Sequence, residues 1–439
     1  MPRPIELQYT PDLIEVGGRA RDAGLEVSLI ERPMPDATSV LAVGRQVDII
    51  SVSGGVRAEN AAGELVDEEA ADDHPLLAAQ RLWTRLATQL GPPGRLPGTG
   101  PVAVGGFSFT DDHELVAPWQ GFPALRWRVP QLAISRSRGR SFLWGDANLL
   151  ELEPGAKAPA VSHLQHHPDP LPVLWQTSVQ LAIDQLRAGR AEKVMLARQL
   201  RLKANGVLDA SRIARSLRSA YPACFTYLIS GDDGSALVGA SPELLLRRHD
   251  RQVTAQPMAG SIARGRDEVE DQLLAEQLRS NGKNWGEHAI TARRVVQVLQ
   301  PFSQQLERLE PEIIRFTNLQ HLATTIEARL KDPPAGLLEL AAALHPTPAV
   351  GGYPTADALR LIAELEGWER GWYAGGVGWL DAHGDGELAV VLRCGLLDPE
   401  GAWLYAGVGV MPDSNPADEL AETELKLQAF LGALGIASS

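Results

Sequence analysis

Apolar positions recur at two periods along the chain, and each period predicts a different kind of element. Helical spacing predicts helices at 72–90, 179–189, 209–219, 271–300, 356–366 and 418–434, the fourth being two helices separated at Asn281. Short apolar runs bounded by turn residues predict strands at 47–52, 102–109, 125–135, 141–144, 193–198, 224–229, 236–239, 371–380, 388–397 and 403–410. The segments 125–135 and 141–144 are expected to pair. Because many strands follow one another by short turns, antiparallel or mixed sheets flanked by helices are expected.

The strength of these patterns divides the chain into three parts. Residues 1–150 form a β-rich N-terminal part of the fold with one clear helix. Residues 151–171 are rich in Pro, Ala and His, which is typical of a linker or a surface loop. Residues 172–436 carry the stronger patterns, and we expect the chemistry there.

Composition and charge narrow the class of protein. The 439 residues include 41 Lys and Arg against 55 Asp and Glu, a net charge of −14. This balance disfavours nucleic acid or an anionic membrane as a partner, since both attract positive surfaces. No apolar run approaches the ~18–20 residues that span a bilayer, and the N-terminus lacks a signal-peptide pattern. With only Cys224 and Cys394 there is no disulfide framework. We expect a soluble protein of the cytoplasm.

Two helical segments carry acidic residues that could bind a metal ion. Glu287 lies in the second half of the 271–300 pattern. Glu419 and Glu422 lie three residues apart in the last helix and share a face, with Lys426 one turn further. Carboxylates from separate helices are ligands that Mg²⁺ accepts while it keeps several waters. A solvated helix face is the alternative interpretation of each segment.

Two cations lie in apolar runs where charged side chains are rare unless they are paired. Lys193 begins the run 193–198, and Arg393 lies in the run 388–397. Such residues suit the binding of a small polycarboxylate, and a structural ion pair is the alternative for each. Glycines at Gly260, Gly407 and Gly409 permit a close backbone approach, as tight packing also would.

Many motifs in order resemble one enzyme family from about residue 172 onward. They are EKVMLAR (192–198), ASPELLLRR (240–248), PMAGSIARG (257–265), GKNWGEH (282–288), QHLATTI (320–326), LHPTPAVGG (344–352), RGWYAGGVGW (370–379), VVLRCG (390–395) and AGVGVMPDSNPADELAETELK (406–426). The chain resembles the chorismate-utilising enzymes, which include isochorismate, salicylate and anthranilate synthases and aminodeoxychorismate synthase component I. The resemblance implies one large α+β domain with two packed, mostly antiparallel β-sheets flanked by helices, and Mg²⁺ and chorismate as ligands.

The resemblance also assigns roles to particular residues. Glu287 and Glu422 would hold Mg²⁺ directly and Glu419 through water. Lys426 and the backbone at Gly407 would help to hold the ring carboxylate, while Arg393 and Tyr373 would hold the enolpyruvyl carboxylate. The remaining expected lining residues of the substrate site are His321, His345, Ala349 and Gly260.

A few positions favour isochorismate synthase within the family. Lys193 stands where the water-using members carry a general base, and Ala259 replaces the lysine nucleophile of aminodeoxychorismate synthases. Lys193 would take a proton from water that attacks C2 of chorismate, and Glu243 would protonate the departing C4 hydroxyl. A buried lysine near other cations can lose its proton, and a carboxyl group in an apolar setting can keep its own.

Alternatives within the family remain open. Salicylate synthase would add pyruvate elimination, although Ala349 stands where those relatives commonly carry threonine. An aminating, anthranilate-synthase-like subunit would need ammonia or a glutaminase partner, which the resemblance to isochorismate synthases does not lead us to expect. Asn284 replaces an acidic residue common in relatives, so a raised Mg²⁺ requirement is expected. A monomer or a weak homodimer is expected.

Overall fold

Antiparallel strands form most of this computed structural model, which describes residues 3–32, 37–71, 73–153, 155 and 164–436. Within these residues a twelve-stranded sheet, sheet A, contains strands from both ends of the chain. Its order is β1 (Ile5–Leu7), β10 (Arg140–Gly145), β9 (Leu132–Ser137), β3 (Ser39–Val43), β2 (Val27–Glu31), β13 (Phe225–Ser230), β14 (Ala236–Ser241), β25 (Cys394–Asp398), β26 (Gly401–Val410), β12 (Lys193–Ala204) and β11 (Leu164–Asp169), with β22 (Gly352–Tyr353) also paired to β12.

A second sheet, sheet B, has eleven strands in the described part of the chain. Its order is β18 (Ser303–Arg308), β21 (Ile326–Leu330), β16 (Gln252–Ala255), β15 (Leu244–His249), β24 (Gly386–Val390), β23 (Gly376–Asp381), β7 (Val102–Phe107), β8 (Leu125–Val129), β4 (Val47–Val52), β5 (Gly55–Asn60) and β6 (Leu65–Ala70). A small third sheet has the order β17 (Met258–Ala263), β20 (Leu319–Ala323) and β19 (Glu312–Arg315).

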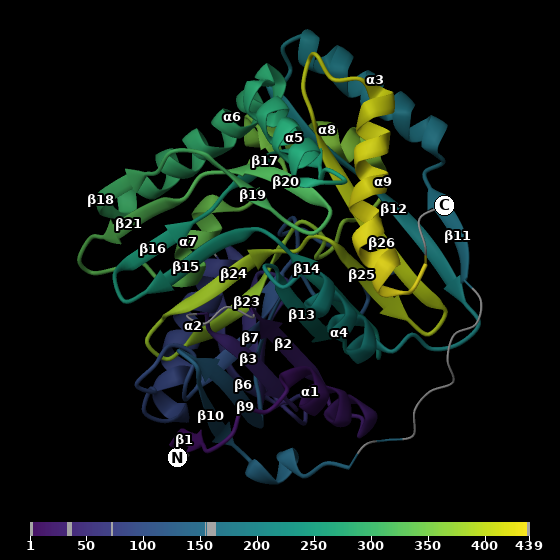
Figure 1. Ribbon diagram of the computed structural model, residues 1–439. Helices are drawn as coiled ribbons and strands as arrows, with labels where there is room; N and C mark the ends of the chain where they lie inside the picture. The colour runs from purple at the N-terminus through teal and green to yellow at the C-terminus, as the bar shows by residue number, and fades with distance from the viewer. Residues whose placement is uncertain (1–2, 33–36, 72, 154, 156–163, 437–439) are drawn as a thin grey trace.

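Helices cover the sheets on their outer faces (Figure 1). They are α1 (Leu13–Asp22), α2 (Pro75–Leu90), α3 (Pro172–Arg187), α4 (Ala210–Ala220), α5 (Glu268–Ser280), α6 (Gly282–Leu299), α7 (Leu337–Leu344), α8 (Thr355–Glu366) and α9 (Pro416–Ala433). One apolar cluster joins the two large sheets and extends to α2, α7 and α8. A second packs α1, α4 and α9 against sheet A. This arrangement confirms the α+β class that the resemblance implied.

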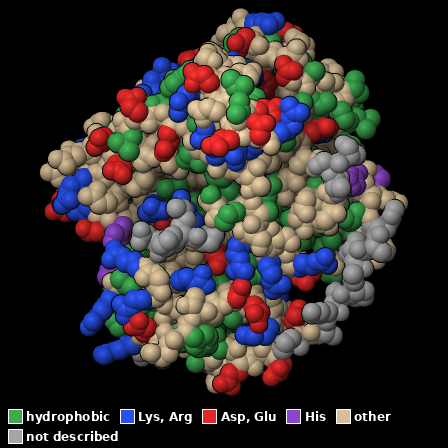
Figure 2. Space-filling model, viewed as in Figure 1, with side chains coloured by type: hydrophobic (Ala, Val, Ile, Leu, Met, Phe, Trp, Pro, Cys, Tyr) green, Lys and Arg blue, Asp and Glu red, His purple; other side chains and the backbone are tan. Residues whose placement is uncertain are grey.

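The expected helices form, and capping side chains begin two of them. The Asp209 side chain accepts a hydrogen bond from the backbone N–H of Arg212 at the start of α4. The Asn281 side chain does the same for Asn284 at the start of α6, so the 271–300 pattern is indeed two helices. No helix in the described ranges is long and apolar enough to cross a membrane. Figure 2 shows acidic and basic side chains interspersed over one face of the molecule.

Three sequence predictions about strands are wrong. The run 125–135 is two strands, β8 in sheet B and β9 in sheet A. Of these two strands, only β9 pairs with β10. Pro130 lies at this break, and proline cannot donate a ladder hydrogen bond. The run 388–397 likewise divides into β24 and β25, in different sheets. Residues 164–169 form β11 and not a loop; residues 154 and 156–163 of the predicted linker lie outside the described residues.

Candidate active site

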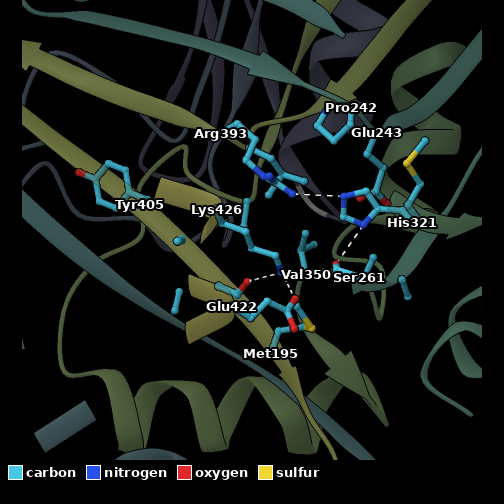
Figure 3. A pocket seen from close by; sticks show the side chains of 18 of the residues that line it. Met195, Pro242, Glu243, Ser261, His321, Val350, Arg393, Tyr405, Glu422 and Lys426 are labelled. Carbon is cyan, nitrogen blue, oxygen red and sulfur yellow. Dashed lines mark hydrogen bonds and ion pairs between the residues drawn. The ribbon is translucent and has the colours of Figure 1, made fainter. Parts of the chain in front are cut away.

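A cavity lies where sheet A meets the small third sheet and helices α6 and α9 (Figure 3). Ten of the expected residues line it or project into it: Glu243, Gly260, Glu287, His321, Ala349, Tyr373, Arg393, Gly407, Glu422 and Lys426. The cavity measures about 70 Å³, whereas ligand sites typically measure ~300–1,000 Å³.

Lys193 is the first residue of β12 and is completely buried. Its Nζ lies 3.1 Å from Oε1 of Glu287 on α6, and no hydrogen bond is recorded for that nitrogen among the described residues. Lys193 and Glu287 therefore form a buried ion pair.

Glu243 lies between β14 of sheet A and β15 of sheet B, where the chain passes from one sheet to the other. Its side chain is buried, and burial raises its pKa to about 8, although an N–H of Met258 and the charges of Lys193 and Lys426 oppose the shift. The carboxyl group is consequently protonated at neutral pH. The charge of Lys193 acts on this carboxyl group, so the two side chains lie near each other.

Arg393 also lies where the chain changes sheets, between β24 of sheet B and β25 of sheet A. The sequence predicted it within a strand, which is wrong: its backbone has φ = 50°, in the left-handed region that few non-glycine residues adopt. The turn directs its guanidinium into the cavity instead of along a sheet (Figure 3). Burial lowers the pKa of Arg393 from its ordinary value, and arginine stays charged at any physiological pH.

A chain of hydrogen bonds runs from Arg393 through His321 to Ser261 (Figure 3). Nη2 of Arg393 lies 3.3 Å from Nε2 of His321, and Nδ1 of His321 lies 3.0 Å from Oγ of Ser261. A guanidinium only donates, so Nε2 accepts and Nδ1 carries the proton. Burial, Arg393 and Lys426 hold the pKa of His321 well below its usual value, which keeps the ring neutral. Ser261 in turn donates to Glu422.

Each expected metal ligand is paired with a lysine. Glu287 pairs with Lys193 at 3.1 Å, Glu422 with Lys426 at 2.6 Å, and Glu419 with Lys283. Burial raises the pKa of Glu422, but Lys426 and Lys283 together lower it by more than burial raises it, so the pKa is below its ordinary value. In the described part of the chain no three Asp, Glu, His or Cys side chains are arranged as a metal site.

The chemistry of these carboxylates nevertheless fits a hard cation. Burial lowers the pKa of Lys283, but Glu419, Glu287 and Glu422 raise it above its ordinary value overall. One ammonium group thus interacts with all three carboxylates from α6 and α9. The site stabilises positive charge with oxygen ligands, as a Mg²⁺ site does.

Backbone and aromatic groups complete the cavity. The carbonyl of Gly407 in β26 accepts a hydrogen bond from Nζ of Lys426 at 2.9 Å. Tyr373 stacks on Tyr405, with ring centroids 5.2 Å apart. Gly260 has φ = 73°, and a Cβ there would lie 3.0 Å from Asn284. Ala349 lies in the loop before β22.

One expected residue lies elsewhere. His345 does not line this cavity: its Nε2 lies 3.0 Å from the carbonyl oxygen of Phe109, and its ring packs edge-on against Phe107 and Phe109. Those contacts place it against a different cavity, on the side of α8. Lys193 and Glu419 lie behind the lining, and Lys193 reaches it through Glu287.

Three residues of the site were not identified from the sequence. Ser261 and Lys283 take part in the contacts above, and Arg370 lines the cavity while it donates to the carbonyls of Val350 and Met195 at 2.9 and 2.8 Å. Lys283 had a signal, because lysine is rare in this arginine-rich chain, whereas Ser261 and Arg370 had none. At Gly409 the sequence indicated a close approach, and a Cβ there would lie 2.1 Å from Oε1 of Glu287.

Comparison with known proteins places the chain in a family. The family model described as chorismate binding enzyme matches residues 144–435. The chain therefore belongs to the chorismate binding enzymes, which confirms the resemblance.

Particular relatives within that family are isochorismate synthases. The isochorismate synthase DhbC of Bacillus subtilis is 38% identical over 295 residues, which cover 65% of this chain and 74% of that protein. The structure of MenF, the menaquinone-specific isochorismate synthase from Escherichia coli, matches with a TM-score of 0.78 at 23% identity and covers 99% of this chain and 95% of its own. Anthranilate synthase component I from Streptococcus pneumoniae matches with a TM-score of 0.73 at 23% identity, over 90% and 92% of the two chains. Fold likeness at this level does not distinguish the two reactions.

Proposed function

We propose that this protein is a Mg²⁺-dependent isochorismate synthase, an isomerase that converts chorismate to isochorismate. One observation carries the proposal: a buried lysine and a buried, protonated glutamate, Lys193 and Glu243, belong to one site. A base and an acid together are the groups needed to add water at one ring carbon and remove hydroxide from another. The similarity to DhbC supports the same reaction.

The charges of the cavity suit a substrate with two carboxylates. Arg393 would bind the enolpyruvyl carboxylate with Tyr373 beside it, since a guanidinium makes strong, oriented bonds with carboxylates. His321 orients that guanidinium from the other side. Lys426 and the backbone at Gly407 would take the ring carboxylate, so the substrate replaces Glu422 as the partner of Lys426.

Glu287 and Glu422 would hold Mg²⁺, and Glu419 would contact it through water. When bound, Mg²⁺ would supply the positive charge that anchors the ring carboxylate and balances these glutamates. Lys193, beside Glu287, would be the base that accepts a proton from water.

The reaction then needs one proton accepted and one donated. Lys193 takes a proton from a water molecule while the oxygen of that water forms a bond to C2 of the ring. The double bonds shift, the C4–O bond breaks, and Glu243 gives its proton to the departing hydroxyl, which leaves as water. The product is an isomer of the substrate, and proton exchange with solvent restores Lys193 and Glu243.

The decisive experiment incubates the purified protein with chorismate and Mg²⁺, without an amine donor, and identifies the products by proton NMR. We expect isochorismate in equilibrium with chorismate, and its loss in the Lys193→Ala variant. Salicylate with an equal amount of pyruvate would show a salicylate synthase instead. Turnover that begins only when ammonia is added would show an aminating enzyme.

A further inference from the structure

A second cavity, here called the α8 cavity, lies apart from the candidate active site. It measures about 700 Å³, within the range of sites for small molecules. Its walls come from α8, from residues 366–371 and from residues 109–112, with His74 and His345 at its edges. Arg370 is the one lining residue that it shares with the active-site cavity among the described residues.

The α8 cavity combines an apolar wall with an excess of carboxylates. Phe109, Leu359, Ile362 and Trp368 supply the apolar surface. Four acids and two arginines also line it, and both arginines are already paired: Arg360 with Asp357, and Arg370 with Glu366.

The carboxylates at one end of this cavity have no strong cation beside them. Asp111 lies 3.0 Å from His74, and within the described chain no lysine or arginine pairs with Asp111, Asp112 or Glu369. Burial raises the pKa of Asp111; His74 lowers it and the neighbouring Asp112 raises it further. Two adjacent carboxylates in this setting attract a positively charged group.

His345 lines the same cavity and carries no charge. The carbonyl of Phe109 can only accept, so Nε2 of His345 carries the proton of the neutral ring. Burial lowers the pKa of His345 to about 4, against a smaller opposing effect of the Phe109 carbonyl, so the ring is neutral at physiological pH. His345 therefore adds no positive charge that would compete with a cation in the cavity.

Two direct contacts join the α8 cavity to the active site. Arg370, paired with Glu366, donates to the carbonyl of Met195, while Glu366 accepts the N–H of Ala197 at 2.7 Å. Both contacts hold β12, the strand that begins with Lys193. Separately, Trp368 stacks on Tyr405, with ring centroids 5.7 Å apart, and Tyr405 stacks on the substrate-site residue Tyr373.

We propose that the α8 cavity binds a small organic cation with an apolar body, and that this binding alters turnover in the neighbouring site through β12 and the stacked aromatic rings. The ammonium lies among Asp111, Asp112 and Glu369, and the apolar body packs on Trp368. Linkage requires that chorismate and the cation change each other's affinity by the same factor. The effect on turnover rests on the proposed function, whereas the binding does not.

A cysteine placed in the cavity tests its preference for cations. Ala363 is exposed, lies on α8 and lines the cavity. The native Cys224 and Cys394 are buried, and burial raises the pKa of each to about 12, so they react slowly. Ala363→Cys is treated with cationic 2-(trimethylammonio)ethyl and anionic 2-sulfonatoethyl methanethiosulfonate, with rates normalised to those of 2-mercaptoethanol. Ser219→Cys, on the exposed face of α4, is the matched control.

We expect the cationic reagent to label Ala363→Cys at least tenfold faster than the anionic reagent, with no such ratio at Ser219→Cys. Added 2-phenylethylamine should slow this labelling, whereas phenylacetate should not. Equal rates, or no protection by 2-phenylethylamine, would overturn the binding site whatever the enzyme's reaction is. For the coupling, the cationic label at position 363 should change kcat/KM at least threefold while unlabelled Ala363→Cys matches the parent; unchanged kcat/KM would overturn the coupling.

Discussion

The protonated state of Glu243 has a measurable effect on stability, and Glu243→Gln isolates it. Glutamine keeps the acceptor for the N–H of Met258 but carries no titrating proton. In the unfolded chain the carboxyl group has its ordinary pKa of 4.5, whereas burial raises the folded value to about 8. Between these values unfolding releases a proton, so the raised pKa stabilises the fold at low pH and this stability is lost as pH rises toward 8.

The magnitude follows from the shift. With one proton bound in the folded state and none in the unfolded state, each pH unit lowers the free energy of unfolding by about 1.4 kcal/mol. Part of the unfolded carboxyl group is still protonated at pH 5, so the loss from pH 5 to pH 7 is slightly less than two full units, about 2.5 kcal/mol. Glu243→Gln does not suffer this loss. Its free energy of unfolding relative to the parent should therefore rise by about 2.5 kcal/mol over this range.

Urea denaturation at pH 5, 6 and 7 in metal-free buffer measures the difference. Glu422→Gln is the matched control, because the pKa of Glu422 is lowered and its stabilisation is lost only as pH falls below 4.5. The Glu422→Gln difference should stay nearly constant from pH 5 to 7. A constant difference for Glu243→Gln as well would refute a protonated Glu243, and with it the proton donor of the proposed mechanism.

Four further predictions concern neighbouring groups. Lys193→Ala should lower kcat by about 10²–10⁴-fold, the usual contribution of a general base; measurable chorismate binding with near-parental kcat would contradict that role. Ser261→Ala should raise KM for chorismate roughly three- to tenfold through one lost hydrogen bond, with kcat little changed; a fall in kcat alone would contradict a positioning role. Arg370→Leu leaves Glu366 buried and unpaired, since both side chains are 3% exposed, and should cost about 3–5 kcal/mol in urea unfolding; a loss below 1 kcal/mol would contradict this. Asn284→Asp adds a charge one turn before Glu287 and should tighten Mg²⁺ binding in calorimetry; unchanged affinity would count against the raised Mg²⁺ requirement.

Local patterns in the sequence were sufficient for the helices and for several strands. The caps Asp209 and Asn281 act within three residues of themselves, so their effect can be read from neighbouring positions. The motifs of the family brought Glu243, Arg393 and Lys426 together although no local signal joins them. The residue types alone left two alternatives open: a structural ion pair for Arg393, and a solvated helix face for the segment that carries Lys426.

The missed features depend on pairings distant in the sequence. An apolar run has the same appearance whether it stays in one sheet or, as at Arg393, changes sheet midway. Ser261 is one small hydroxyl among many until β17 and β20 bring it to His321. His345 belongs to a motif of the family, yet its contact with Phe109 directs it away from the substrate site.

The strand order of sheet B sets a minimum delay for folding during synthesis. β7, at Val102–Phe107, pairs with β23, at Gly376–Asp381. One edge of β7 therefore lacks its partner strand until about 270 more residues have been synthesised. At roughly 5–20 residues per second, this takes roughly 15–50 s. During that time β7 exposes an apolar strand edge on the ribosome. A nascent chain of this protein therefore depends on shielding of that edge, and a stalled or truncated chain would be prone to aggregation.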